Sequence, residues 1–184
     1  YEAIPGFGED RDYHKMSKEE IINAVKEAGI VGMGGAGFPT HVKLMPKNPE
    51  KIDTILINGS ECEPYLTSDY RMMLEEGEHV VEGLKIELSL FPGAKGVIGI
   101  EDNKSEAIRH MEELVANEPD IRVQPLKTKY PQGGERMLIN AVTGRTLNSS
   151  MLPADVGCIV SNVDTAIAIY NAVAKTTPLI RRII

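Results

Sequence analysis

The residues of this chain that could do chemistry lie in three loops, and the first is rich in glycine. Five of the nine residues from Gly29 to Gly37 are glycine, and Lys43 follows. Clustered glycines allow close approach to the main chain and leave bare N–H groups, which suit an anionic phosphate. We expect the ligand to meet Gly32, Gly34, Gly35, Ala36 and Gly37. The alternative is a mobile glycine linker, although Phe38 and Val42 are not typical linker residues.

The same loop matches the letters of a dinucleotide-binding pattern but not its context. Gly32, Gly34 and Gly37 have the spacing G-x-G-x-x-G, which functions between a strand and a following helix. Here the loop follows a predicted helix over residues 17–28, and Pro39 comes almost at once. No Gly-Lys-Ser/Thr sequence is present, which excludes a Walker loop. The sequence therefore predicts a phosphate site but not a standard Rossmann turn.

Polar residues after a predicted strand over residues 52–58 form the second loop. Asn58, Glu61 and Glu63 lie where an α/β sheet places its ligands, at the carboxyl end of a strand. The third loop, residues 130–135, contains two adjacent glycines and opens a helix. The plain alternatives are a solvated acidic turn and an ordinary strand-to-helix connection. Together the loops describe a site for a ligand with a phosphate and many hydroxyl or amide groups, such as flavin mononucleotide (FMN).

No other group of residues predicts catalysis or a metal site. Cys62 and Cys158 are far apart and outside any CxxC pattern, so we expect inert thiols. His41 and His79 are each unaccompanied by residues that would complete a catalytic or metal-binding set. We therefore expect no catalytic side chain and no metal ligand.

The composition is that of a globular domain with an acidic balance. The 184 residues are 42% hydrophobic and 26% charged, and the net charge of −7 argues against a nucleic-acid surface. No run approaches the roughly 18 apolar residues of a membrane span, so any membrane association would come through a partner. The cysteine content favours a reducing, cytoplasmic-side location. The chain starts at Tyr1 and ends in what reads as an unfinished strand, so we expect a fragment of a longer protein.

The elements that position the loops alternate between strand and helix from residue 52 onward. Pro125 favours an edge position for the third of four predicted strands, which cover residues 52–58, 96–100, 121–126 and 157–161. This order predicts an α/β, Rossmann-like fold, with a mostly parallel sheet covered by helices on both faces and with an N-terminal helix and glycine-rich loop. We expect a connecting segment over residues 1–16, the ligand-binding domain over 17–177, and the start of a truncated following domain over 178–184.

Helical periodicity and capping residues predict the first two helices. Ser17 and Glu20 form a capping box for the helix that Gly29 ends. A second helix is predicted over residues 75–90, with an apolar side.

The later helices are placed by their expected caps and buried faces. Asn103 and Glu106 are expected to cap the third helix. The fourth ends at Gly144 and should bury Met137, Leu138, Ala141 and Val142. Asn162 caps the last helix, which is the plain alternative to a ligand role for this residue.

Three separated motifs resemble one family of flavoproteins. The motifs are Gly34-Gly35-Ala36-Gly37-Phe38-Pro39-Thr40 with Lys43, Asn58 with Glu61-Cys62-Glu63-Pro64, and Tyr130-Pro131-Gln132-Gly133-Gly134-Glu135. In this order they closely resemble the FMN-binding domain of the NADH-oxidising flavoprotein subunit of respiratory complex I. The second and third motifs resemble the variant found in RnfC-type subunits of the Rnf electron-transport complex, a ferredoxin:NAD oxidoreductase. The resemblance covers roughly residues 17–184.

The resemblance implies which residues meet the cofactor. The glycine loop would pass close to the flavin and the dinucleotide, with Lys43 beside FMN and Phe38 stacked on NADH. The remaining implied contacts, with the flavin, the nicotinamide or both, are Asn58, Glu61, Glu63, Tyr130, Gly133, Glu135, Asn162 and Thr165. The chain departs from the complex I pattern in three places, at Ser60, at Gly134, and at Leu44 with Pro46.

The resemblance also implies an enzyme domain. It would exchange a hydride between NAD(H) and FMN, with onward electron transfer to 4Fe-4S clusters outside this fragment. Its partners would be other Rnf subunits and, indirectly, ferredoxin, with no nucleic acid and no direct membrane insertion. Its location would be the cytoplasmic side of the cell membrane, peripheral through the complex. A cobalamin-reductase-like flavoprotein and a cofactor-free scaffold domain stay open as alternatives, and the three departures favour the scaffold.

Overall fold

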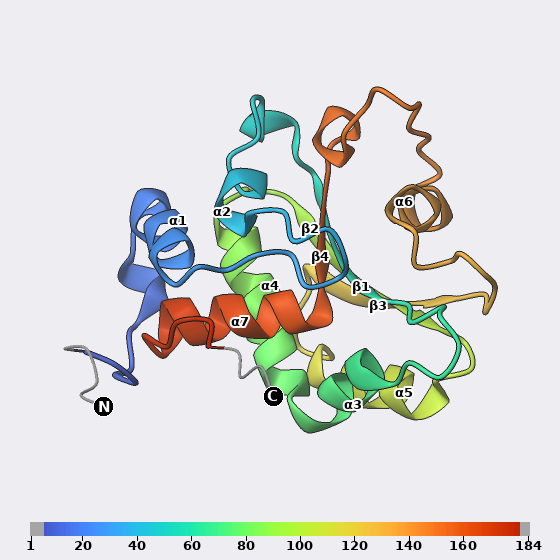
Figure 1. Ribbon diagram of the computed structural model, residues 1–184, viewed down its shortest axis with the longest axis horizontal. Helices are drawn as coiled ribbons and strands as arrows, with labels where there is room; N and C mark the ends of the chain where they lie inside the picture. The colour runs from blue at the N-terminus through green and yellow to red at the C-terminus, as the bar shows by residue number, and fades with distance from the viewer. Residues whose placement is uncertain (1–5, 181–184) are drawn as a thin grey trace.

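A four-stranded parallel sheet forms the centre of the molecule, a computed structural model that describes residues 6–180. The strand order is β3-β2-β1-β4, and every pairing between these strands is parallel (Figure 1). The strands are β1 (Thr54–Gly59), β2 (Lys95–Glu101), β3 (Ile121–Leu126) and β4 (Cys158–Asn162). The predicted parallel α/β fold is confirmed, and β3 lies at an edge as Pro125 indicated.

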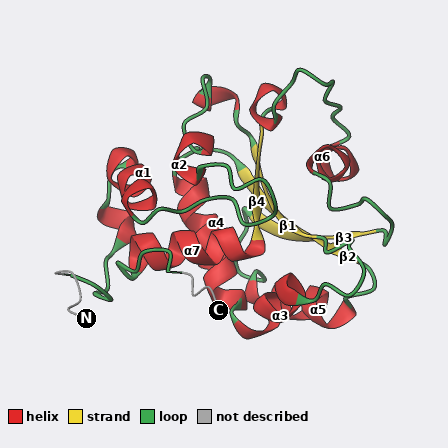
Figure 2. Cartoon of the chain, in the orientation of Figure 1, coloured by secondary structure: helices red, strands yellow, loops and turns green. Residues whose placement is uncertain are grey.

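Helices cover both faces of the sheet (Figure 2). The α-helices are α1 (Lys18–Glu27), α2 (Thr40–Lys43), α3 (Ser68–Glu75), α4 (Gly77–Ser89), α5 (Ser105–Leu114), α6 (Glu135–Thr143) and α7 (Val163–Ala174). Short 3-10 turns are η1 (Tyr13–Lys15), η2 (Pro49–Lys51) and η3 (Pro153–Val156). None of the helices between residues 6 and 180 has the length and hydropathy needed to cross a lipid bilayer.

The two faces differ in how thickly they are covered. Successive strand residues point to opposite faces, so Ile55 and Ile57 join the core under α4 and α7, while Leu56 joins the smaller core under α6. The contact between α4 and α7 requires a glycine, because a Cβ atom at Gly83 would lie 2.1 Å from the carbonyl oxygen of Ala166. This close contact fixes where α7, and with it the end of β4, lies against the sheet.

The N-terminal part of the described chain packs onto the domain. The Ser17–Glu20 capping box is present, with Glu20 N–H donating to Ser17 Oγ at 3.2 Å and Ser17 N–H to the Glu20 carboxylate at 2.7 Å. Tyr13 is buried, and the Arg11 guanidinium donates to the Ala172 carbonyl at 2.6 Å. Residues 6–16 of the expected connecting segment thus lie against α7, and residues 1–5 are outside the described part.

Two predictions about helix starts are wrong. The predicted helix over residues 75–90 begins at Gly77, because Glu76 breaks from the helical conformation with φ −127° and separates α4 from α3, a helix that was not predicted. Asn103 does not cap α5; its N-cap is Lys104, with no side-chain hydrogen bond. The Glu106 carboxylate instead accepts a hydrogen bond from the Tyr70 hydroxyl at 2.9 Å.

Two further predictions differ from the structure. Met137 and Ala141 are exposed on α6, whereas Leu138 and Ile139 are fully buried, because the helix turns a neighbouring stripe towards the sheet. Residues 178–180 are not in a strand, and the rest of the predicted final strand, 181–184, lies outside the described residues.

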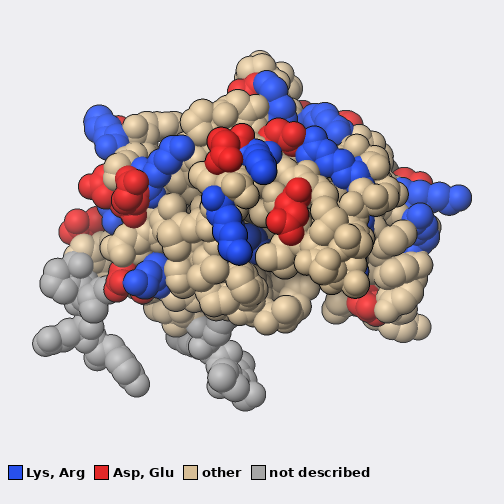
Figure 3. Space-filling model, turned by 90° about the horizontal axis from the view of Figure 1, so that it is seen from above, with Lys and Arg blue, Asp and Glu red and all other residues tan. Residues whose placement is uncertain are grey.

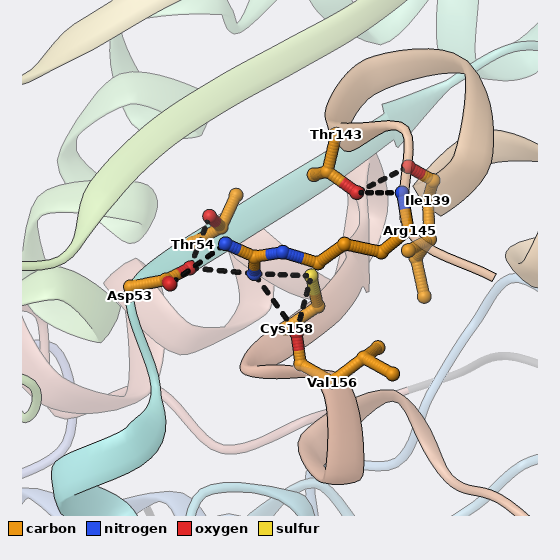
Figure 4. Close-up of polar contacts among 7 residues, drawn as sticks. All are labelled: Asp53, Thr54, Ile139, Thr143, Arg145, Val156 and Cys158. Carbon is orange, nitrogen blue, oxygen red and sulfur yellow. Dashed lines mark hydrogen bonds and ion pairs between the residues drawn. The ribbon is translucent and has the colours of Figure 1, made fainter. Parts of the chain in front are cut away.

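The amino ends of β1 and β4 are held together by one arginine (Figure 4). Arg145 forms two hydrogen bonds with the Asp53 carboxylate, both at 2.7 Å, and donates to the Val156 carbonyl at 2.8 Å. The guanidinium lowers the pKa of Asp53, whereas burial raises the pKa of the neighbouring Cys158 thiol. We refer to Arg145 and its three partners, Asp53, Val156 and Cys158, as the amino-edge clamp.

Candidate functional site

The carboxyl ends of β1 and β4 meet where the strand order reverses. β2 and β3 continue the sheet on one side of β1, whereas β4 returns on the other side. Asn58 and Asn162 are register partners at the ends of these two strands. In open α/β sheets ligands bind outside such a switch point, because the chain leaves the two strands in opposite directions. We refer to this end of β1 and β4, with the loops around it, as the switch-point site.

The glycine-rich loop docks onto the start of α7 at this site. The Met33 N–H donates to Thr165 Oγ1 at 2.9 Å, and Thr165 is buried in the first turn of α7. A Cβ atom at Gly34 would lie 3.1 Å from the Cβ of Asn162. The absence of a side chain at Gly34 therefore lets the loop lie directly against the end of β4.

The turn of this loop, residues 34–37, presents bare main chain to solvent. The Gly32 N–H donates to the Phe38 carbonyl at 2.8 Å and closes the loop. The N–H groups of residues 34–37 donate no hydrogen bond to another residue within the described chain. Gly35 and Gly37 have φ of +145° and +63°, and a Cβ atom at either would meet nothing within 4 Å. Exposed N–H groups of this kind bind phosphates, so the loop fits the phosphate of a nucleotide-like cofactor.

Lys43, the last residue of α2, lies beside the outer edge of β4. Its Nζ donates to the Val160 carbonyl at 2.6 Å. β4 is the last strand of the described sheet, and the Lys43 ammonium group bonds to the main chain of this strand. The lysine thus brings a half-buried positive charge to the strand that ends at Asn162.

Asn58 ties the second loop to the third. Its Nδ2 donates to the Gly133 carbonyl at 2.8 Å, and its Oδ1 accepts from the Ser60 N–H at 3.1 Å. Only glycine fits at position 133, since a Cβ atom there would lie 2.2 Å from the Ser60 carbonyl oxygen. Two loops that are distant in sequence therefore form one wall of the switch-point site.

The Glu61 carboxylate is engaged at the start of α3. It accepts from the N–H groups of Asp69 at 2.8 Å and Tyr70 at 3.0 Å, and from Ser68 Oγ at 3.3 Å. The N-cap residue, Thr67, makes no side-chain capping bond. Glu61 therefore caps α3 from outside the helix, where its negative charge also interacts favourably with the positive end of the helix dipole.

Asn162 caps α7, as predicted, and also reaches α3. Its Oδ1 accepts from the N–H groups of Asp164 at 3.0 Å and Thr165 at 3.4 Å, while its Nδ2 donates to Asp69 Oδ2 at 2.7 Å. Partial burial and the nearby charge of Glu61 raise the pKa of Asp69 to about 6, although the hydrogen bond from Asn162 opposes this. Asp69 was not among the predicted site residues, because α3 was not predicted.

The remaining predicted contacts lie at the surface around the site. Phe38 is 49% exposed and Tyr130 is 69% exposed. Glu63 and Glu135 are also exposed, the latter at the first position of α6. These four side chains point outward rather than filling the core, so a ligand could reach them.

A pocket of about 290 Å³ adjoins the site at the ends of β2 and β3. Tyr65, Tyr130 and Lys104 line it, together with Glu101, which is 1% exposed. Burial raises the pKa of Glu101, although the Lys129 N–H donates to it, and its Oε1 has no partner among the described residues. Glu101 directly follows the predicted strand over 96–100, so the sequence did hold a signal for this residue.

Charged side chains give little sign of a broad binding field. On the face drawn in Figure 3, basic and acidic side chains lie interspersed. An anion that approached this face would meet no wide positive surface, and local groups such as the N–H groups of residues 34–37 would have to hold it.

Comparison with known proteins identifies the class to which this fold and site belong. Residues 25–171 match the family described as the Nuo51 FMN-binding domain, and the chain belongs to this family. The resemblance drawn from the three motifs is thus confirmed. Among individual proteins, the chain is similar to subunits of ferredoxin:NAD(+) oxidoreductase complexes.

Two of these relatives are named as subunits of ferredoxin:NAD(+) oxidoreductase complexes. The chain is 49% identical over 182 residues to a subunit of the proton-translocating ferredoxin:NAD(+) oxidoreductase complex of Clostridium ljungdahlii, covering 99% of this chain and 40% of that protein. It is 47% identical to the corresponding subunit of the Na(+)-translocating ferredoxin:NAD(+) oxidoreductase complex of Acetobacterium woodii, covering 91% of this chain and 38% of that protein. The chain therefore spans about two fifths of the length of these relatives.

A solved structure shares the fold. An NAD+-reducing [NiFe]-hydrogenase in the air-oxidised state matches with a TM-score of 0.72 at 24% identity, covering 90% of this chain and 31% of that one. An NAD+-reducing [NiFe]-hydrogenase in the H2-reduced state matches with a TM-score of 0.69. The predicted Rossmann-like architecture is thus confirmed, while the ligand roles of individual residues stay predictions.

Proposed function

We propose that this chain binds FMN at the switch-point site and serves as the flavin-binding domain of an NADH-linked electron-transfer subunit of the Rnf type. The observation that supports this most is the convergence of the three motifs. The glycine loop, joined to α7 through Met33 and Thr165, and the second and third loops, joined through Asn58 and Gly133, all lie at the same end of the sheet. Membership of the Nuo51 FMN-binding domain family supports the choice of flavin.

Each part of the site has a role in this proposal. The N–H groups of residues 34–37 hold the phosphate, and Lys43 offsets negative charge near the cofactor. Asn58 and Asn162 keep the surrounding loops in place through their amide hydrogen bonds. Phe38 and Tyr130 offer exposed aromatic surfaces against which NAD(H) stacks. When bound, FMN would supply the redox chemistry, exchanging a hydride with NAD(H) and releasing electrons singly.

We also propose a setting for the domain, supported by the names of its relatives. Residues 17–177 form the binding domain, residues 6–16 connect to it and pack against it, and residues 178–184 begin a following domain. Electrons pass to 4Fe-4S clusters in the rest of the protein, and the partners are the other subunits of an Rnf-type complex and, through them, ferredoxin. The protein works on the cytoplasmic side of the membrane and is peripheral to it. The names of the two ferredoxin:NAD(+) oxidoreductase relatives support this setting.

FMN titration tests the proposal directly. Adding FMN to the complete protein that carries this chain, depleted of flavin, should quench flavin fluorescence with a saturating curve and one site per chain. Addition of NADH without oxygen should then bleach the visible absorbance of the oxidised flavin. Fluorescence equal to that of the same concentration of free FMN, at every FMN concentration, would contradict the proposal and favour a cofactor-free scaffold.

A further inference from the structure

A glutamate lies fully buried beneath the switch-point site. Glu87 of α4 is 0% exposed, and its Oε2 accepts a hydrogen bond from Ser161 Oγ at 2.7 Å. Its Oε1 has no hydrogen-bond partner within residues 6–180. Burial of a carboxylate with one unpaired oxygen is costly, so an apolar residue would serve the core better. None of the ligand contacts proposed for the switch-point site gives Glu87 a role.

We refer to the glycine loop, residues 32–37, together with Lys43 as the cofactor platform. Three consecutive residues of β4 connect the Glu87 carboxyl group to this platform. Val160 accepts the hydrogen bond from Lys43, Ser161 donates to Glu87, and Asn162 packs against Gly34 in the glycine loop. The buried acid and the lysine of the platform are thus attached to neighbouring positions on one strand. A change of charge on Glu87 acts on Lys43 through low-dielectric protein rather than through water.

Lys43 is the charged group that acts on Glu87. Burial raises the pKa of Glu87 to about 7, and the hydrogen bond from Ser161 and the positive charge of Lys43 oppose the rise. The core on this face of the sheet contains buried apolar side chains such as Ala166, Ile57 and Ile98. The other titratable groups on or against α4 act elsewhere. His79 pairs with Glu76 and stacks on Tyr170, while Glu82 pairs with Lys85 and accepts from the Tyr13 hydroxyl. Asp164 acts on Asp69, and Glu78 is exposed.

We propose that Glu87 is a buried proton-binding group that sets the net charge behind the cofactor platform, so that binding of an anionic flavin is coupled to protonation of its carboxylate. Glu87 is a positioning residue, because it acts through Lys43 and Ser161 and does not touch the ligand. This inference rests on the proposed FMN site and adds a property of its own.

The sign of the coupling follows from electrostatics. An anion bound near Lys43 repels the ionised form of Glu87 and favours its neutral form, so binding raises the pKa of this carboxyl group and takes up a proton. By linkage, the affinity for FMN falls as the pH rises from 6 to 8, by up to about tenfold for each unit by which binding raises the pKa. The FMN phosphate, with a pKa of about 6, would release a proton when bound as the dianion, which is the opposite sign.

The test compares two isosteric variants on the same helix in the complete protein. Glu87→Gln keeps an acceptor for Ser161 but removes the charge, and Glu78→Gln changes an exposed residue of α4 as the control. FMN dissociation constants are measured by fluorescence at pH 6, 7 and 8. We expect Glu87→Gln to match the wild type at pH 6 and to bind about three- to tenfold more tightly at pH 8. Glu78→Gln should follow the wild type throughout.

Calorimetry supplies a readout on the wild type itself, should Glu87→Gln fail to fold. Titrations with FMN at pH 7 in two buffers of different ionisation enthalpy give the number of protons exchanged. Binding of FMN as the dianion releases roughly 0.1 proton from its phosphate at pH 7, and this release is subtracted. Proton uptake beyond this correction supports the proposal, whereas zero corrected exchange or net release overturns it, as does a Glu87→Gln variant with the same pH dependence as the wild type. If the wild type binds no FMN at any pH, the proposed function itself fails.

Discussion

The two ends of the parallel strands are built in opposite ways. We call the end where β1 and β4 begin the amino edge, and the end where they finish, at the switch-point site, the carboxyl edge. At the amino edge, the Arg145 guanidinium meets the Asp53 carboxylate, a main-chain carbonyl and a thiol (Figure 4). At the carboxyl edge, the N–H groups of residues 34–37 have no partner within the described chain. β1 and β4 are neighbours at both ends, so the difference in hydrogen bonding does not come from a different pair of strands.

Buried polar atoms show the same contrast. Those without a partner in the described part of the chain belong to Thr40, Ser60, Glu87, Glu101 and Gln132, and none belongs to the amino-edge clamp. Three of these residues lie towards the carboxyl edge: Ser60 follows β1, Glu101 ends β2, and Gln132 lies in the loop between β3 and α6. Because native proteins pair nearly all buried polar groups, such a concentration indicates where a ligand or water completes the structure. The amino edge stabilises the fold, and the carboxyl edge is arranged for binding.

Carboxylates at the two edges also differ in their acidity. Burial raises the pKa of Asp69 and of Glu101 at the carboxyl edge, whereas the Arg145 guanidinium lowers that of Asp53. The first two favour the neutral acid and the third favours the anion. The edges should therefore respond to pH in opposite directions.

The largest effect is expected from closing the gap at Gly133. In Gly133→Ala the new Cβ atom would lie 2.2 Å from the Ser60 carbonyl oxygen, so the second and third loops must separate. We expect FMN binding to weaken by about a hundredfold, or ~3 kcal/mol. Gly134→Ala is the matched control, because its Cβ atom would lie 3.1 Å from its nearest neighbour and φ is −62°. Equal affinities in the two variants would contradict a shared wall formed by these loops.

A second prediction compares the pH dependence of stability at the two edges. The pKa of Asp69 is raised from 3.8 to about 6, so its stabilising contribution is present below pH 3.8 and is lost as the pH rises through 6. The stability of the wild type relative to Asp69→Asn should therefore fall by about 2–3 kcal/mol between pH 4 and pH 7. Denaturant unfolding at several pH values measures this difference.

Asp53→Asn should show the reverse trend. The pKa of Asp53 is lowered, so its contribution is present above pH 3.8 and is lost as the pH falls through its folded pKa. The variant should be less stable than the wild type at pH 7 and approach it in acid. If both variants responded to pH in the same direction, the proposed contrast between the edges would be wrong.

The smallest effect is expected from cutting the amino-edge clamp. Arg145→Met removes the paired hydrogen bonds to a half-exposed Asp53 and the bond to Val156, which should cost about 1–2 kcal/mol of unfolding free energy. Its effect on FMN affinity should stay within about twofold, because the clamp lies at the other end of the strands. Arg109→Met, at an exposed position on α5, serves as the control. A loss of FMN affinity as large as that of Gly133→Ala would mean that the edges are not independent.

Local signals in the sequence predicted much of the fold. The capping box at Ser17 and Glu20, the left-handed glycine at Gly144 and the edge strand with Pro125 each depend on neighbours in the chain, and each is present. Alternation of strand and helix was enough to predict the parallel sheet. The end of this sheet that carries polar loops could likewise be predicted, because ligands meet the carboxyl ends of parallel strands.

Long-range contacts explain what could not be predicted from the sequence. α3 has no capping side chain of its own, and the carboxylate that caps it comes from Glu61 in the preceding loop. Without α3, Asp69 could not be placed beside Asn162. Glu87 could have been found, since it follows Val80 by seven residues on the inward stripe of α4, but its partner Ser161 comes from a distant strand. Residues paired through such contacts are not visible as local patterns.

Hydrogen–deuterium exchange with and without FMN tests the central claim most directly. The N–H groups of residues 34–37 have no partner within the described chain, so they should exchange fast in the free protein and become protected when FMN binds. Peptides that contain Asp53 or Arg145 at the amino edge should keep the same exchange. Protection confined to the loop at residues 34–37 and to the second and third loops would support the account. Saturation with FMN that leaves residues 34–37 as fast as before would contradict it.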